Sequence, residues 1–147
     1  MPCAVSCVPL PIFPILQEVE FSLAPLLFSA SVLFWVAGFD IIYSLQDDKF
    51  DSAHQLHSIP VALGRKNALL LSRFLHLLTA ASLFYAGQLL ETQYLYWIGF
   101  VIFSFLLFYQ HILVSEKNLS KVNLAFFTTN GIASIIFGAF VISELLF

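Results

Sequence analysis

The chain has 147 residues, of which 60% are hydrophobic and only 10% are charged, and its mean hydropathy is +0.91. A soluble domain is usually about half apolar and a quarter charged, so this composition is typical of a protein that folds in a bilayer. The net charge of −3 argues against nucleic acid as a partner, because nucleic-acid-binding proteins present a basic face.

The first twenty residues contain four prolines, three of them at positions 9, 11 and 14, and no Lys or Arg. Prolines interrupt helices and a secretory signal needs a basic start, so we expect an irregular lead-in over residues 1–20. Cys3 and Cys7 lack the further ligands of a structural zinc site and are interpreted as small apolar residues. Residues 21–147 are expected to form one transmembrane domain.

Four apolar stretches follow the lead-in, and each is close to the roughly 20 residues that a helix needs to cross hydrocarbon. They cover residues 21–45, 68–90, 94–114 and 124–147. A segment in lipid must satisfy its own backbone polar groups, so all four are expected to be helices. The predicted fold is an all-α integral membrane bundle of about four transmembrane helices.

Basic residues are distributed unevenly among the connections between these stretches. The polar connections 46–67 and 115–123 contain three and two Lys or Arg residues, whereas the turn at 91–93 contains none. Basic connections tend to stay in the cytoplasm. We therefore expect a multi-pass protein of the cell inner (plasma) membrane, with connection 46–67 in the cytoplasm and both termini on the opposite side.

Acidic residues gather at the end of the first apolar stretch. On a continuous helix at 100° per residue, Asp40, Tyr43, Asp47 and Asp51 fall on one narrow stripe. An ionisable group inside a membrane segment, such as Asp40, is costly and indicates a functional site. Asp47 and Asp51, one turn apart, can hold a cation together, and their hard oxygen ligands suit Mg²⁺ shared with substrate phosphates.

Simpler interpretations of these residues stay open. The acids near position 47 can be the solvated end of a helix at the membrane surface, although this leaves the deeper Asp40 unexplained. Arg65 and Lys66 suit contacts with phosphate oxygens, but they are equally suited to anchor the topology of the chain.

Other polar and aromatic residues in the apolar stretches have structural interpretations. His76 is expected to be packed or to lie at the interface, and Asn123 and Asn130 to form hydrogen bonds between helices. Tyr94, Tyr96 and Trp97 lie at the start of the third stretch and are typical of the aromatic belt at a membrane surface.

The segment WVAGFDIIYSLQDDKFDSAHQLHSIPVALG resembles the second aspartate-rich motif of the UbiA superfamily of membrane prenyltransferases. Within it, the resemblance is to the 4-hydroxybenzoate polyprenyltransferases and their menaquinone-pathway relatives. It rests on the GFD sequence, on Tyr43, on the D-x3-D of Asp47 and Asp51, and on the HSIP and LG that follow. The similarity extends over about residues 22–147.

The resemblance implies a fold of nine membrane helices around a cavity, with the four stretches matching the last four helices. It also implies two cytoplasmic aspartate-rich motifs that hold Mg²⁺ and a prenyl diphosphate. The implied reaction transfers a polyprenyl group to an aromatic acid such as 4-hydroxybenzoate in ubiquinone or menaquinone biosynthesis. The assigned site residues are Asp47 and Asp51 for Mg²⁺, Arg65 and Lys66 for the diphosphate, and Tyr43 and Asp40 for orienting the acceptor or the metal site.

The chain also departs from the family pattern. The first aspartate-rich motif has no counterpart before residue 21, and Ser52 and Ala53 stand where the family often has basic residues. We therefore expect a fragment of a longer enzyme, or self-association that covers the Asp40 stripe, and weak activity by this chain alone. The alternative is a non-catalytic four-helix membrane protein, such as a small transporter subunit. A transporter should carry charges near the midplane of several helices, whereas these acids collect at the end of one.

Overall fold

The computed structural model describes residues 23–115 and 119–146. The predicted irregular lead-in at 1–20, with Cys3 and Cys7, lies outside the described residues. The elements in chain order are α2 (Leu23–Ser44), α3 (Asp48–Ala53), α4 (Ile59–Leu89), α5 (Tyr94–Leu113), the π-helical turn η1 (Leu124–Thr129) and α6 (Asn130–Leu146).

The described residues contain four helical spans that are long and apolar enough to cross a membrane, as the sequence predicts. The fourth span passes through η1 into α6. Large apolar side chains on the outside of the bundle, such as Ile135 and Leu77, are 73% and 65% exposed. Such outward apolar surface is stable in lipid, where it remains in an apolar environment. The all-α membrane bundle is therefore confirmed.

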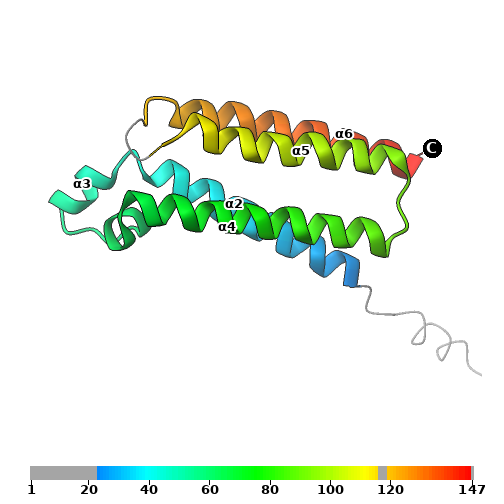
Figure 1. Ribbon diagram of the computed structural model, residues 1–147, viewed down its shortest axis with the longest axis horizontal. Helices are drawn as coiled ribbons and strands as arrows, with labels where there is room; N and C mark the ends of the chain where they lie inside the picture. Colours follow the sequence, from blue (N-terminus) through cyan, green and yellow to red (C-terminus); the bar gives the residue numbers. More distant parts are fainter. Residues whose placement is uncertain (1–22, 116–118, 147) are drawn as a thin grey trace, which may run out of the picture.

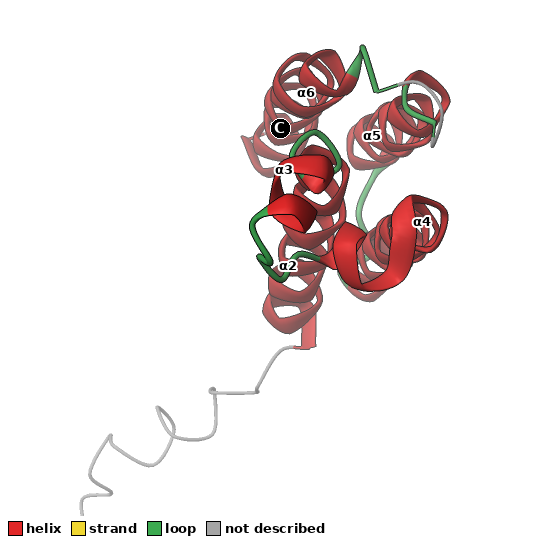
Figure 2. Ribbon diagram, turned by 90° about the vertical axis from the view of Figure 1, so that its left-hand side faces the viewer, coloured by secondary structure: helices red, strands yellow, loops and turns green. Residues whose placement is uncertain are grey.

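The long helices are arranged as two packed pairs, α2 with α4 and α5 with α6. Figure 2 shows the four helices end-on, and Figure 1 shows α3 at one end of the bundle and the C-terminus at the other. The connection between α2 and α4 and the connection between α5 and α6 therefore lie at the same end. The turn between α4 and α5 lies at the end with the C-terminus.

Small residues allow α2 and α4 to approach closely. The Ser72 hydroxyl donates to the carbonyl oxygen of Gly38 across a distance of 2.6 Å. A Cβ atom at Gly38 would lie only 2.4 Å from the ring of His76. Because lipid supplies no hydrophobic drive between helices, contacts of this kind through small and polar residues hold membrane helices together.

The start of α5 is anchored by Glu144 and by a buried tyrosine. The Glu144 carboxylate accepts hydrogen bonds from the backbone N–H groups of Gln93 and Tyr96. The Tyr96 hydroxyl donates to the carbonyl oxygen of Leu83, 2.7 Å away, and its side chain is 1% exposed. The expectation that Tyr96 belongs to a surface belt is therefore wrong, because its hydroxyl finds a buried acceptor on α4.

Two helix boundaries differ from the expected ones. The first span ends at Ser44 instead of continuing as one helix through Asp51. The next span begins at Ile59, earlier than the apolar stretch suggests, and is interrupted at Gly64, where φ is 79° and ψ is 154°. Only glycine adopts this backbone conformation readily, so Gly64 allows the chain to change direction just before the main part of α4.

Candidate functional site

The acidic residues lie at the α3 end of the bundle, where α2 is connected to α4 (Figure 1). After α2 the backbone hydrogen bonds span three residues instead of four. Gln46 N–H donates to the Tyr43 carbonyl oxygen at 3.1 Å, and Asp47 N–H donates to the Ser44 carbonyl oxygen at 3.3 Å. The continuous stripe of the sequence analysis is therefore broken. Its first half, with Asp40, is on α2, and Asp47 is in the turn.

Asp47 and Asp51 nevertheless remain one turn apart. The Asp51 N–H donates to the Asp47 carbonyl oxygen at 2.8 Å, across the start of α3. Asp47 is exposed and Asp51 is partly buried. Within residues 23–115 and 119–146, no hydrogen bond or ion pair engages either carboxylate. The D-x3-D spacing thus presents acceptor oxygens that the protein itself does not use.

Asp47 and Asp51 can supply only part of the ligands of Mg²⁺, so the rest must come from water or from a bound phosphate. Mg²⁺ commonly takes one or two carboxylates and completes its octahedral shell with waters and phosphate oxygens. Across the described residues, no group of three or more His, Cys, Asp or Glu side chains is arranged to hold a metal ion. The carboxylates therefore suit a cation that arrives with a phosphate.

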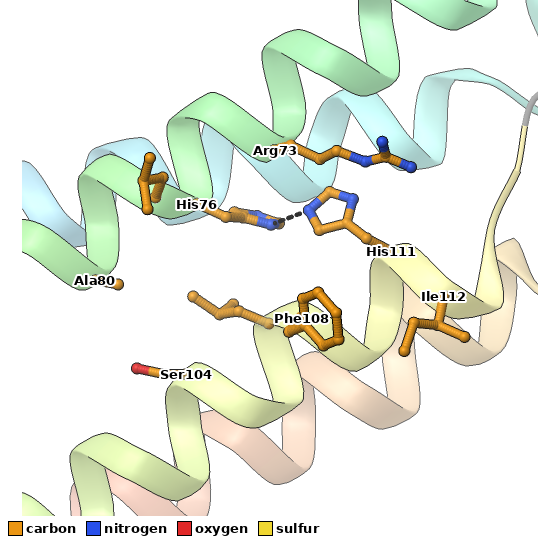
Figure 3. A pocket seen from close by; sticks show the side chains of 9 residues that line it. Arg73, His76, Ala80, Ser104, Phe108, His111 and Ile112 are labelled. Atoms are coloured by element: carbon orange, nitrogen blue, oxygen red, sulfur yellow. Dashed lines mark hydrogen bonds between the residues drawn. The ribbon is translucent and has the colours of Figure 1, made fainter.

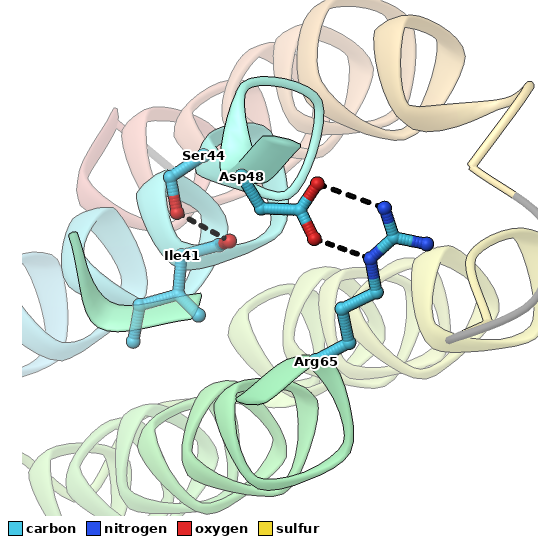
Figure 4. Close-up of polar contacts among 4 residues, drawn as sticks. All are labelled: Ile41, Ser44, Asp48 and Arg65. Atoms are coloured by element: carbon cyan, nitrogen blue, oxygen red, sulfur yellow. Dashed lines mark hydrogen bonds and ion pairs between the residues drawn. The ribbon is translucent and has the colours of Figure 1, made fainter. Parts of the chain in front are cut away.

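Asp48 and Arg65 form an ion pair that the sequence analysis did not anticipate (Figure 4). Arg65 Nη2 donates to Asp48 Oδ1 at 2.8 Å, and Arg65 Nε donates to Asp48 Oδ2. This bidentate arrangement matches the planar fork of the guanidinium to the carboxylate. It ties α3 to the start of the main part of α4 and keeps Arg65 beside the acidic segment.

The two basic residues assigned to the diphosphate line different pockets. Arg65 and Asp48 border a pocket of about 540 Å³ under α3, together with Gly64. Lys66 lines a separate pocket of about 270 Å³, which Arg73 also lines. Of the assigned pair, Arg65 is thus the cation that the structure brings beside the acidic segment.

Tyr43 belongs to a row of aromatic side chains between α2 and η1. Its ring centroid lies 4.4 Å from that of Phe126, and the Phe39 centroid lies 5.2 Å from the same ring. Tyr43 is 37% exposed, and Asp40, which directly follows Phe39 in the chain, is also exposed. The structure therefore places Tyr43 in an aromatic surface near the acidic turn, with Asp40 exposed one turn earlier on α2.

Polar side chains fasten this aromatic row to the fourth span. Trp35 Nε1 donates to Asn130 Oδ1 at 3.3 Å, and Gln46 Nε2 donates to Asn123 Oδ1 at 3.0 Å. The bond of Asn130 confirms the expected hydrogen bond between helices, whereas Asn123 accepts from the turn that follows α2. The intervening π turn, η1, contains Phe126, and π turns inside α-helices often occur at functional sites.

A second polar cluster, between α4 and α5, was not predicted from the sequence. His76 Nδ1 lies 2.8 Å from His111 Nε2 (Figure 3). It also lies 3.2 Å from Gln110 Nε2. His76 Nε2 lies 3.4 Å from the Trp35 carbonyl oxygen, so three elements meet at one imidazole. His76 is buried, which confirms its expected role as a packed histidine. The signal for the cluster was two polar pairs in otherwise apolar spans, Arg73 with His76 and Gln110 with His111.

The hydrogen bonds assign the protons of this cluster. A carbonyl oxygen only accepts, so His76 carries its proton on Nε2, and the single lone pair on its Nδ1 accepts from the nearer donor, the Nε2–H of His111. The neutral His111 ring then has its lone pair on Nδ1. That nitrogen is buried without a partner among the described residues.

These observations define a multi-pass membrane helical bundle with carboxylates open to a cation at one end. Comparison with family models matches residues 3–132 to the UbiA prenyltransferase family. The chain belongs to this family, whose activity is prenyl transfer in the membrane. The match begins inside the predicted lead-in and ends within α6, whereas the resemblance in the sequence was placed at about residues 22–147. Comparisons with curated proteins and with solved structures gave no match.

Proposed function

We propose that this protein takes part in the Mg²⁺-dependent transfer of a polyprenyl group from a prenyl diphosphate to an aromatic acid, such as 4-hydroxybenzoate, in ubiquinone or menaquinone biosynthesis. Membership of the UbiA prenyltransferase family supports the class of reaction. The observation that carries the proposal is the pair of unengaged carboxylates, Asp47 and Asp51, one turn apart at the end of a membrane bundle. The proposed location is the plasma membrane, with this segment facing the cytoplasm.

The charged residues near the turn have two proposed roles, binding Mg²⁺ and binding the diphosphate. Asp47 and Asp51 would hold Mg²⁺, which when bound neutralises charge on a diphosphate leaving group. Arg65, kept in place by Asp48, adds positive charge where the diphosphate would lie. Lys66 is adjacent in sequence but lines another pocket, so Arg65 is the stronger of the two candidates.

The aromatic row beside the acidic turn suits the organic part of the substrates. Phe39 and Phe126 offer apolar ring surface for a prenyl chain, and aromatic faces also attract cations such as an allylic cation. Tyr43, which contacts Phe126, and Asp40, which is exposed one turn earlier on α2, are proposed to orient the aromatic acceptor or the metal site. We expect slow turnover from these residues alone, because the described carboxylates provide one side of a Mg²⁺–diphosphate complex.

Asp47→Asn and Asp51→Asn test this proposal in the purified chain. Each change removes a charged ligand, so Mg²⁺-dependent binding of a non-hydrolysable geranyl diphosphate analogue should weaken about tenfold or more; losing even an indirect metal contact commonly costs that much. Binding is measured by calorimetry in a neutral detergent with and without Mg²⁺.

Glu91→Gln is the matched control, because it removes one exposed carboxylate at the opposite end of the bundle. It should leave the binding unchanged. Full Mg²⁺-dependent binding in both aspartate variants would contradict the assigned site. An equal loss of binding in the control would show that the effect comes from the net charge of the protein and not from these two ligands.

A further inference from the structure

The cavity between α4 and α5 is charged at one end and mostly apolar along the rest, where the Ser104 hydroxyl is the polar group of the lining. It has a volume of about 630 Å³. Arg73 and His111 lie at the end nearer the acidic turn, and Ala80 and Phe108 continue the lining away from it (Figure 3). Leu77 also lines the cavity. Leu77 and Phe108 are each 65% exposed, so the cavity opens on the outer surface of the bundle, where lipid would lie.

A smaller pocket continues the cavity toward the end of the bundle. Its volume is about 270 Å³, and Lys66, Ser115 and Arg73 are among its lining residues. Arg73 lines both spaces, which makes it the junction between them. Lys66 is two helical turns from Arg73 on the same face of α4. The combined site thus has two cations at the membrane surface and an apolar channel running inward.

The cations at this site have no carboxylate partner among the described residues. In the part of the chain that the structure describes, no salt bridge engages Lys66 or Arg73. An unpaired Arg within a membrane span is costly, and an anionic group beside it offsets that cost. Among the described residues, the lining contains no carboxylate, so this part of the chain does not suit a diphosphate that needs Mg²⁺ held by the protein.

We propose that the site between α4 and α5 binds a bilayer phospholipid with a net negative headgroup. Its phosphate lies between Arg73 and Lys66, and one acyl chain occupies the apolar cavity beside Ala80. The orientation agrees with that of a lipid in the leaflet nearer the acidic turn, with its headgroup at the surface and its chain toward the midplane. This assignment does not depend on prenyl transfer.

The test compares two phospholipids with identical acyl chains, anionic phosphatidylglycerol and zwitterionic phosphatidylcholine. The purified chain in neutral detergent is titrated with each, and native mass spectrometry counts the lipids retained. Phosphatidylglycerol should be retained preferentially. Arg73→Gln should weaken its binding about fivefold, which corresponds to one basic residue at an anionic lipid surface. Lys121→Gln, the matched loss of an exposed basic residue in another connection, should have no effect.

A second variant tests the acyl chain separately. Ala80→Phe fills the apolar part of the cavity and should reduce retention of phosphatidylglycerol, while circular dichroism confirms that the helices are intact. Asp47→Asn should retain the lipid fully, so this proposal and the proposed function can fail independently. Equal retention of the two lipids, or no effect of Arg73→Gln, would overturn the assignment. Displacement of phosphatidylglycerol by geranyl diphosphate without Mg²⁺ would instead assign the site to the prenyl substrate and equally overturn it.

Discussion

Gly38 shows how a single missing side chain determines the packing of α2 against α4. The His76 ring fills the space beside Gly38 and is held by hydrogen bonds to α2 and α5. Gly38→Ala would place a Cβ 2.4 Å from that ring, which has little room to move. We expect a loss of about 1–3 kcal/mol in the free energy of unfolding, the usual cost of overpacking.

The measurement for Gly38→Ala is thermal unfolding in detergent, followed by circular dichroism. Gly131→Ala is the matched control, because no atom lies within 4 Å of the Cβ that it adds. Alanine at an open helical position should be neutral or slightly stabilising. If the two variants melt at the same temperature, the close approach at Gly38 does not limit stability.

The pair of Asp48 and Arg65 is expected to fasten a short element more than to stabilise the whole protein. The side chains are 13% and 30% exposed, so solvent screens the pair only in part. Asp48→Asn should cost about 1 kcal/mol, the upper end for such surface pairs. The effect should appear locally, as faster hydrogen exchange of the Asp51 and Leu56 amides, which close the turns of α3.

A double-mutant cycle with Arg65→Gln distinguishes the pair from its separate charges. Coupling near zero between the two changes would show that the contact contributes nothing to holding α3. Exchange at Leu83, in the middle of the bundle, should be the same in every variant, because this residue is buried far along α4.

At the scale of elements, the four long spans were predictable and their ends were not. Hydrocarbon thickness imposes a minimum length on each apolar stretch, so composition alone locates the spans. The break after Ser44 carries no Gly or Pro, and its sequence, Leu-Gln-Asp, is compatible with a helix that continues. Asp47 nevertheless favours ending the helix here, because an Asp side chain competes for backbone hydrogen bonds and prefers caps and turns.

In the candidate site, too, one feature could be predicted from the sequence and others could not. The separation of Asp47 and Asp51 is local, and a helical spacing of four residues was enough to predict it. The contact between Asp48 and Arg65 joins positions on both sides of a turn, and the contact between His76 and His111 joins two spans. Neither follows from periodicity, because each depends on how separate helices pack.

At the scale of the whole molecule, the structure puts connection 45–58 and the described residues 114–115 and 119–123 at one end, and the turn at 90–93 at the other. The uneven distribution of Lys and Arg assigns the first end to the cytoplasm. In cells carrying a variant without Cys3 and Cys7, a membrane-impermeant maleimide added outside should label a cysteine at Leu90 and not one at Ser52.

Both labelling positions are exposed, so accessibility should differ only by the side of the membrane. Permeabilised cells provide the control, since both cysteines should then react. Labelling at Ser52 and not at Leu90 in intact cells would invert the proposed orientation and place the acidic turn outside.

The π turn at Leu124–Thr129 sets the angular phase of the last span. A π turn holds one residue more than the α turn it replaces, and one residue corresponds to about 100° of rotation. Phe126, inside the turn, meets Tyr43, and Asn130, after it, meets Trp35. Deleting one residue there would leave the hydropathy of the span almost unchanged, yet it would rotate one of these contacts away from α2. The contacts of this span with α2 therefore depend on the rotation of the helix about its axis, which its hydropathy does not reveal.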